Sequence, residues 1–444
     1  MPNRLFGTDG VRGVANDDLS CELAYHLGMG AVGVLGPHIV VGRDTRRSGT
    51  MLESALTAGI MAAGGTPECC GIIPTPAVAL LTVRHHADAG VVISASHNPP
   101  EYNGIKFFGP DGMKASDEAE DALADFVDGG WRDLRLGVGE GVGDIRKVKT
   151  AREEYVSHAI STIDCDLSGI RIALDCAHGA SCRTTPEALE RLGAEVHAIN
   201  LDHDGMDINV GCGSTHLDKV RELVLATGAD VGIAHDGDAD RVLFVDAEGN
   251  DVDGDFVLAI CAADLQDRGM LAGNEVVSTV MCNLGFVRAM QARGIDVVQT
   301  PVGDRFVLQR MLADGAVIGG EQSGHIIFLK HNTTGDGLVT ALQLLGVMKR
   351  TGKPLAELAG VMRRFPQSLV NVRTPRKAEW STNEAISAAV ARETGLLGDS
   401  GRVLVRASGT EPLVRVMVEA AQEAQALECA ERIADVVRSE LDGQ

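Results

Sequence analysis

The amino-acid sequence predicts an α/β protein in which three related α/β domains and a smaller C-terminal α+β domain surround a central cleft. Three observations carry this prediction. A short apolar strand followed at once by a dense polar loop occurs three times, and helical patterns alternate with such strands along the chain. In addition, 444 residues are too many for one hydrophobic core. Internal similarity at domain-sized spacing indicates related units that each contribute a loop to a shared site.

Each repeat begins at a helix end and continues into a buried strand. The strands cover residues 91–93, 233–234 and 316–318, and the polar loops that follow them cover residues 94–99, 235–241 and 319–325. Ligands of open α/β sheets bind beyond the carboxyl ends of the strands, so we expect these loops to meet there. An ordinary polar turn is the alternative for any single loop, but three loops at matching positions argue against it.

Composition restricts the classes of function. The formal net charge of −22 argues against a nucleic-acid partner, and an aromatic content of 3% argues against base-stacking surfaces. The sequence contains no signal peptide and no apolar run long enough to span a membrane, so we expect a cytoplasmic protein without a membrane partner. The ten cysteines include no CxxC pair and are expected to be reduced thiols.

Domain boundaries follow from composition and turn signals. A glycine-rich, weakly apolar stretch over residues 129–143 marks the first boundary, and Pro366 marks the last. We therefore predict four domains, over residues 1–150, 151–252, 253–366 and 367–444. Patterning predicts helices at 19–35, 151–162, 186–192, 384–394 and 424–441, and strands at 39–44, 170–176, 195–201, 242–246, 368–373, 403–405 and 414–418.

Three features of the first domain need interpretation. Residues 6–13 form a glycine-rich turn in which Arg12 is the charged side chain suited to an anion, although a plain N-terminal hairpin would look similar. Residues 28–33 match GxGxxG, but they lie inside a helical pattern with no strand before them, so we reject a dinucleotide site. Lys106 lies among apolar residues of a strand, and we expect it to face the cleft because an unpaired buried ammonium is costly.

The second polar loop carries alternating carboxylates. In extended backbone Asp236, Asp238 and Asp240 would project to one side, where their mutual repulsion favours a bound cation. A site with only a few protein oxygen ligands suits Mg²⁺, which keeps its other positions for water or phosphate. A solvated acidic turn is the plain alternative. An EF-hand is excluded because Arg241 replaces the required glycine and Ala247 the bidentate glutamate. A haloacid-dehalogenase-like phosphatase with Asp236 as nucleophile remains a rival, but it leaves the Ser96 loop unexplained.

Two further loops suit a phosphosugar. The first, at residues 406–415, offers hydroxyls, free backbone N–H groups and guanidinium groups, all of which bind phosphate oxygens. An ordinary hairpin is the alternative interpretation of this loop. In the third repeat, Glu321 and Ser323 stand among glycines and suit sugar hydroxyls. The predicted phosphate-binding residues are Arg406, Ser408, Gly409, Thr410 and Arg415.

Together these motifs resemble the α-D-phosphohexomutase superfamily over essentially the whole chain. The motifs are residues 6–13, 94–99, 236–241, 320–325 and 406–412, in the order typical of that superfamily. The resemblance is closest to bacterial members that interconvert glucosamine 6-phosphate and glucosamine 1-phosphate on the route to UDP-N-acetylglucosamine. Phosphomannomutase or phosphoglucomutase activity, or a Mg²⁺-dependent sugar phosphatase, are the alternatives.

The resemblance also implies residue roles. Ser96 would carry the phosphoryl group and help three aspartates to hold Mg²⁺, Lys106 and Arg12 would stabilise transferring charge, and His97 or His325 would transfer protons. It further implies a hexosamine 1,6-bisphosphate activator and leaves a homodimer open. A phosphosugar-binding regulator is the non-catalytic alternative, and the intact Ser96 and aspartate loops argue against it. The implied substrate-binding residues are Arg241, Gly303, Asp304, Glu321, Ser323 and His325.

Overall fold

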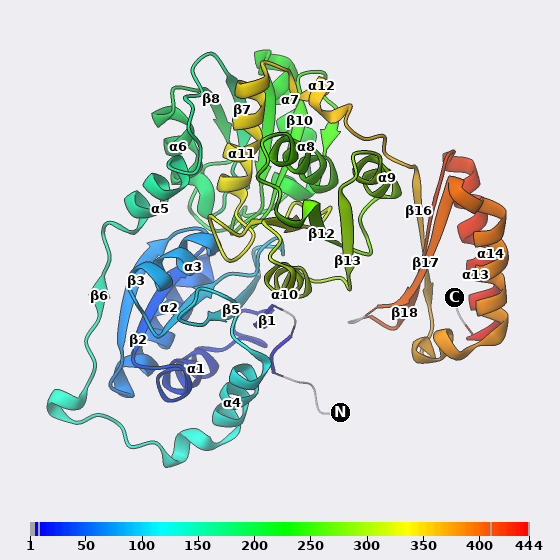
Figure 1. Cartoon of the computed structure of the whole chain (residues 1–444). Coiled ribbons are helices and arrows are strands. Elements are labelled where there is room, and N and C mark those ends of the chain that lie inside the picture. Colours follow the sequence, from blue (N-terminus) through cyan, green and yellow to red (C-terminus); the bar gives the residue numbers. More distant parts are fainter. Residues whose placement is uncertain (1–4, 8, 409–410, 443–444) are drawn as a thin grey trace. The chain divides into compact units, whose positions relative to one another are not determined.

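The computed structural model describes residues 5–7, 9–408 and 411–442 (Figure 1). The described residues fall into two compact units, which we treat separately. The larger unit lies within residues 1–281 and 294–361, and the smaller within residues 282–293 and 362–444.

Helices and strands alternate along the larger unit, as patterning predicts. Its strands are β1 (Val11–Val14), β2 (His38–Arg43), β3 (Thr66–Ile72), β4 (Ala89–Ile93), β5 (Tyr102–Phe108), β6 (Arg146–Lys147), β7 (Arg171–Asp175), β8 (Glu195–Ile199), β9 (Val231–His235), β10 (Val242–Asp246), β11 (Asp251–Val252), β12 (Glu275–Thr279), β13 (Asp296–Thr300), β14 (Ile318–Gly320) and β15 (Ile326–Phe328). Its helices are α1 (Cys21–Val34), α2 (Arg47–Ala62), α3 (Thr75–Arg84), α4 (Asp117–Asp128), α5 (Ala151–Ile160), α6 (Thr185–Arg191), α7 (Asp218–Thr227), α8 (Gly254–Asp267), α10 (Asp304–Asp314), α11 (Gly337–Thr351) and α12 (Leu355–Ala359).

Three sheets of the larger unit share one strand order. The orders are β5-β4-β2-β3, β10-β9-β7-β8 and β15-β14-β12-β13, with further strands added to the first two sheets. In each sheet β2, β7 or β12 pairs in parallel with two neighbours, and an antiparallel strand returns beside β4, β9 or β14. The predicted repeat is therefore a buried strand, a polar loop and a returning strand. The prediction of three related α/β domains is confirmed.

Burial explains why these strands are apolar throughout. All five residues of β4 and all five of β9 are buried, since helices cover both faces of such sheets. β4 ends where its polar loop begins, whereas β9 and β14 extend into the first residues of theirs, and β14 begins at Ile318, two residues later than predicted. Helices α3, α7 and α10 precede β4, β9 and β14. The repeated sequence pattern thus places the three loops at equivalent sheet edges.

Two glycines permit close contact between α1 and α2. A Cβ on Gly28 would lie 2.1 Å from the carbonyl oxygen of Leu56, and a Cβ on Gly59 would lie 2.0 Å from that of Tyr25. These distances are far below van der Waals contact, so larger residues would force the helices apart. The GxGxxG match therefore reflects helix packing, in agreement with its rejection as a nucleotide motif.

From sequence, the adjacent His85 and His86 are expected to form a solvated helix end, and His85 differs from this expectation. His86 is exposed as expected, but His85 is half-buried, with Nδ1 2.7 Å from Glu68 Oε2 and Nε2 3.0 Å from Glu154 Oε2. Burial opposes the charged imidazole, yet the hydrogen bonds to these two glutamates raise its pKa. His85 thus connects β3 and α5 to the end of α3.

The smaller unit has a three-stranded antiparallel sheet in the order β16-β18-β17 and its own hydrophobic core. Buried Glu419 of the central strand accepts hydrogen bonds from Asn283 Nδ2 (3.0 Å), the Leu284 N–H (3.0 Å) and Arg402 Nε (2.8 Å). These contacts hold a helix from earlier in the chain in this unit. The elements are α9 (Leu284–Ala292), β16 (Gln367–Arg373), α13 (Glu384–Leu397), β17 (Gly401–Ala407), β18 (Leu413–Ala420) and α14 (Glu423–Glu440).

Two chain-wide expectations can also be compared with the structure. No disulfide joins the ten cysteines, all of which lie within the described residues, in agreement with the expected thiols. Within the described ranges, every helix is either too short or too polar to cross a lipid bilayer.

Candidate active site

Ser96 lies in the loop between β4 and β5 and touches the aspartate loop of the second sheet. Its side chain is only 2% exposed, and its hydroxyl donates a 2.6 Å hydrogen bond to Asp236 Oδ2. Its backbone has a φ of +50°, a conformation that L-residues adopt rarely and that marks functional strain. The predicted meeting of the first two polar loops is therefore present.

Asp236, Asp238 and Asp240 form a buried carboxylate cluster. One oxygen from each lies within 4.8 Å of the others. Among the described residues, Asp238 Oδ1 and Asp240 Oδ1 have no hydrogen-bond partner although both are buried. Orphaned carboxylate oxygens that converge in this way fit a hard divalent cation such as Mg²⁺. The residues present thus match the predicted metal loop.

The electrostatics of the cluster lead to the same conclusion. Burial, with Asp240 and Asp238 nearby, raises the pKa of Asp236 well above its usual value. Burial and Asp240 raise the pKa of Asp238 to about 6. Asp240 behaves differently, because His325, Arg241 and Lys106 outweigh burial and lower its pKa. A cation would stabilise the ionised form of all three carboxylates.

Lys106 and Arg12 bring positive charge to the same site. They lie on the paired strands β5 and β1, where Arg12 is opposite Gly104. Lys106 Nζ is 3.6 Å from Asp9 Oδ1, and Arg12 Nη2 is 3.3 Å from Asp9 Oδ2. Burial disfavours the Lys106 ammonium, but Asp9 and other acids nearby raise its pKa, so it is charged. Lys106 is paired and directed toward the acidic site, as expected.

Two histidines near the cluster have opposite protonation states. His97 Nδ1 lies 3.5 Å from Ser96 Oγ and 3.2 Å from Arg241 Nη1, and burial together with Arg241 lowers its pKa to about 4. His325 Nδ1 lies 3.4 Å from Asp240 Oδ2; burial opposes its charge, but Asp240 raises its pKa to about 9. His97 is thus suited to accept a proton and His325 to donate one.

The third repeat contributes a polar wall. Arg241 and His325 form a β-bridge that joins the second and third loops, and Glu321 Oε1 accepts a 3.2 Å hydrogen bond from the Gly303 N–H. Asp304 is the first residue of α10, and Ser323 is exposed on its loop. The structure therefore places all six predicted substrate residues in connected loops, with Ser323 exposed at their surface.

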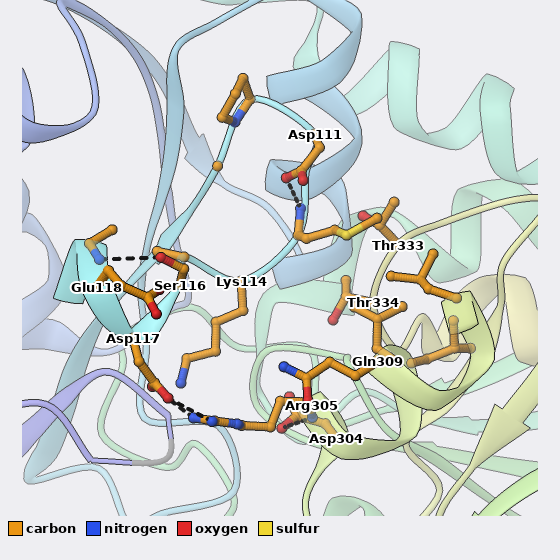
Figure 2. Close-up of a pocket in the computed structure, with 18 of the residues that line it drawn as sticks. Asp111, Lys114, Ser116, Asp117, Glu118, Asp304, Arg305, Gln309, Thr333 and Thr334 are labelled. Carbon is orange, nitrogen blue, oxygen red and sulfur yellow. Dashed lines mark hydrogen bonds and ion pairs between the residues drawn. The ribbon is translucent and has the colours of Figure 1, made fainter. Parts of the chain in front are cut away.

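A cavity of about 490 Å³ opens beside this wall, between the start of α4 and α10. Figure 2 shows Lys114, Gln309 and Thr334 around it, and the forked ion pair in which Arg305 binds Asp117 at 2.8 and 2.7 Å. Asp304 and His325 also line the cavity, so it adjoins the site already described. Its volume lies in the range of small-molecule pockets.

The predicted phosphate-binding residues lie in the smaller unit. Arg406 of β17 is directly opposite Arg415 of β18, and burial with Arg415 nearby lowers the pKa of Arg406. Arg415 Nη2 also lies 3.1 Å from Glu411 Oε2, and Ser408 is buried beside these strands. Paired guanidinium groups of this kind suit an anion. Gly409 and Thr410 lie outside the described residues.

Sequence reasoning missed four residues that support the site. Thr75 Oγ1 donates a 2.5 Å hydrogen bond to Asp238 Oδ2. Asp44, Arg46 and Asn209 surround the backbone of the Ser96 loop. The available signal was the charge that follows β2 in Asp44-Thr45-Arg46, beside the strand that leads to Ser96.

A strained serine, a buried carboxylate cluster and paired cations on this fold define an enzyme of phosphoryl transfer. The chain belongs to the phosphoglucomutase/phosphomannomutase family. It matches that family's alpha/beta/alpha domain I over residues 3–130, domain II over 153–249, domain III over 253–365 and C-terminal domain over 369–436.

Several known proteins are similar over the whole chain. A phosphoglucosamine mutase of Symbiobacterium thermophilum is 53% identical over 99% of this chain and 100% of its own. That of Frankia casuarinae is 52% identical over 99% of both chains. A phosphoglucomutase/phosphomannomutase family protein of Burkholderia thailandensis has the same fold, with a TM-score of 0.82, 24% identity and coverage of 99% and 98%. Aspergillus fumigatus N-acetylphosphoglucosamine mutase, solved with GlcNAc-6P and magnesium, has a TM-score of 0.71, 18% identity and coverage of 98% and 95%.

Proposed function

We propose that this protein interconverts glucosamine 6-phosphate and glucosamine 1-phosphate through a phosphoserine at Ser96 and a sugar bisphosphate, on the route to UDP-N-acetylglucosamine. The observation that carries the proposal is the 2.6 Å contact between the Ser96 hydroxyl and Asp236 in a cluster of buried carboxylates. The choice of sugar is supported by full-length relatives named phosphoglucosamine mutase at 53% and 52% identity.

Mg²⁺ would be held by Asp236, Asp238, Asp240 and an oxygen on Ser96. It would neutralise charge on the phosphoryl group. The fit of the donors supports this assignment, because three carboxylates converge and two of their oxygens have no other hydrogen-bond partner among the described residues.

The chain's own side chains would perform the remaining steps. In the first half-reaction the bond from phosphorus to Ser96 Oγ breaks and a bond to the sugar hydroxyl oxygen forms, while neutral His97 accepts the hydroxyl proton and passes it to the departing Ser96 Oγ, 3.5 Å from its Nδ1. Lys106 and Arg12 stabilise the transferring charge. In the second half-reaction the other phosphoryl group returns to Ser96 Oγ, whose proton goes to His97, and His325 supplies a proton to the sugar oxygen released; proton exchange with water then restores both histidines.

The sugar bisphosphate must turn around between the two half-reactions. Arg406 and Arg415, with Ser408, Gly409 and Thr410, would hold whichever phosphate is not reacting, and Arg241, Gly303, Asp304, Glu321, Ser323 and His325 would bind the sugar. A hexosamine 1,6-bisphosphate would act as activator because it can phosphorylate a bare Ser96. The proposal divides the chain into a phosphoserine domain (1–150), a metal-binding domain (151–252), a sugar-binding domain (253–366) and a phosphate-binding domain (367–444), and it is compatible with a homodimer.

Phosphorylation mapping and turnover test this proposal together. A fraction of the purified protein should carry one phosphate, which peptide mapping should place on Ser96 and not on Ser94. Ser96→Ala should fold, bind Mg²⁺ through the aspartates and lose nearly all mutase activity. Initial rates should be highest with glucosamine 6-phosphate when compared with glucose and mannose 6-phosphates.

Two outcomes would contradict the proposal. A phosphoryl label on Asp236, with release of inorganic phosphate, would establish the phosphatase alternative. Normal turnover by Ser96→Ala would exclude the phosphoserine. Dephosphorylated wild type that regains activity after treatment with a hexose 1,6-bisphosphate would distinguish a mutase from a phosphatase, which would only hydrolyse that compound.

A further inference from the structure

We propose that Arg46 is a positioning residue that holds Ser96 in its reactive conformation by binding the backbone carbonyls of the Ser96 loop. This inference rests on the proposed role of Ser96. Arg46 immediately precedes α2, is distant in sequence from every predicted motif, and is 0% exposed. A buried guanidinium needs an acid and a full set of acceptors, so its partners indicate its role.

Every side-chain N–H of Arg46 has a partner. Nε donates to Asp44 Oδ2 at 2.9 Å, which balances the charge. The two terminal nitrogens donate their four protons to main-chain carbonyls of one segment. These carbonyls belong to Ser96 (2.9 Å), Asn98 (2.7 Å), Tyr102 (3.0 Å) and Pro99. The guanidinium therefore supplies the donors that irregular, buried backbone would otherwise lack.

The same network also holds the other side of Ser96. The Ser96 N–H donates to Ser94 Oγ at 3.0 Å, and Ser94 Oγ donates to Asp44 Oδ2 at 2.6 Å. From the second sheet, Asn209 Nδ2 donates to the Ser96 carbonyl at 2.8 Å. Both backbone polar groups of Ser96 are thus bound, directly or through one residue, to the pair formed by Asp44 and Arg46.

This network explains how a serine keeps a φ of +50°. That conformation is unfavourable for an L-residue and persists only where its surroundings determine it. Here it directs Oγ toward Asp236 at 2.6 Å. If the carbonyls of residues 96–102 lost their donors, the loop would relax and Ser96 would leave the carboxylate cluster. A lysine at position 46 could keep the ion pair with Asp44, but its single ammonium could not bind four carbonyls.

Arg46→Lys tests the proposal, and Arg43→Lys is the matched control. Arg43 is the last residue of β2, is half-buried, and binds Glu53 at 2.9 Å and the Asp44 carbonyl. Among the described residues, its side chain makes no hydrogen bond to residues 94–102. Under conditions where both variants are fully folded, Arg46→Lys should lower kcat about 10- to 100-fold, because a displacement near 1 Å can cost that much. KM for the phosphosugar and the Mg²⁺ affinity should stay within about twofold, and Arg43→Lys should match wild type within about twofold.

A second pair of variants separates positioning from general stability. Ser94→Ala removes the acceptor for the Ser96 N–H and should also lower kcat, whereas Ser94→Thr keeps the hydroxyl and should restore most of it. Hydrogen–deuterium exchange supplies a readout independent of turnover. In Arg46→Lys, amides of residues 94–104 should exchange faster while those of residues 38–43 and of α2 remain unchanged.

The outcomes distinguish this proposal from the proposed function. A folded Arg46→Lys protein with wild-type kcat, or with a raised KM and unchanged kcat, would overturn the positioning role. Unchanged exchange over residues 94–104 would overturn it even if the wild type turned over none of the phosphosugars. An inactive wild type whose Arg46→Lys variant shows faster local exchange would instead refute the proposed function and leave the positioning role supported.

Discussion

Gly237→Ala should separate the two loops that meet at Ser96. Gly237 lies between two of the clustered aspartates, and a Cβ built on it would lie 2.6 Å from the Ser96 carbonyl oxygen. Ordinary contact begins at 3.4 Å, so the added methyl group is about 0.8 Å too close. The carbonyl cannot move freely because Arg46 and Asn209 both bind it. The Ser96 loop as a whole must therefore shift away from the metal loop.

The size of this shift sets the expected loss of activity. Displacement of a reacting group by about 1 Å can cost about 100-fold, so a shift near 0.8 Å should lower kcat by about 10- to 100-fold. Overpacking of a buried contact also costs about 1–3 kcal/mol of unfolding free energy. The protein should thus remain folded at room temperature while its turnover falls.

Steady-state kinetics, with urea unfolding in parallel, would measure both effects. Gly33→Ala in α1 is the control, because a Cβ there meets nothing within 4 Å, and it should keep kcat and gain about 0.5–1 kcal/mol of stability. If folded Gly237→Ala turned over within about twofold of wild type, the distance from Ser96 to the metal loop would not limit the reaction, and our reading of this contact would be wrong.

Three further predictions address other parts of the chain. Asp238→Asn should raise the melting temperature of the metal-free protein, because it removes one of three buried carboxylates that repel one another. It should also weaken Mg²⁺ binding measured by calorimetry, and a lower melting temperature of the metal-free protein would contradict this prediction. His85→Gln should cost about 1.5–3 kcal/mol of unfolding free energy near pH 5.5. The pKa of His85 is raised in the folded state, so its contribution is complete below the unfolded pKa near 6.5 and is lost as pH rises through the folded pKa. Urea unfolding should therefore show a smaller penalty at pH 9, with the variant of its exposed neighbour, His86→Asn, as the control. Arg415→Ala should raise KM about 10- to 100-fold for both the 1- and the 6-phosphate, and initial rates that change with only one of them would exclude a shared phosphate site.

The repeated architecture could be predicted from the sequence because a strand that is buried on both faces is a continuous run of apolar residues. β4 and β9 are continuous apolar runs, and their loops change abruptly to polar residues. Chemistry-bearing residues such as Ser96 and Asp236 follow these runs directly, so their convergence could be predicted from the rule for sheet edges.

The supporting residues could not be found in the same way. Arg46 acts on carbonyl groups that lie 50 to 56 positions further along the chain, and carbonyls have no sequence signature. His85 looked like a surface residue because its partners Glu68 and Glu154 come from different elements. Such roles depend on contacts between segments that are distant in sequence, and hydrophobic periodicity does not predict those contacts.

The contacts of Glu419 limit how the chain can be divided. A fragment beginning at residue 367 would keep Arg402 beside this carboxylate but would lose the Asn283 amide and the Leu284 N–H. A buried acid deprived of such partners is strongly destabilising. A chimaera that takes its C-terminal sheet, with Arg406 and Arg415, from a relative should therefore take residues 282–293 from the same relative. Otherwise the sheet must come from a relative in which the contacts of α9 with Glu419 are kept.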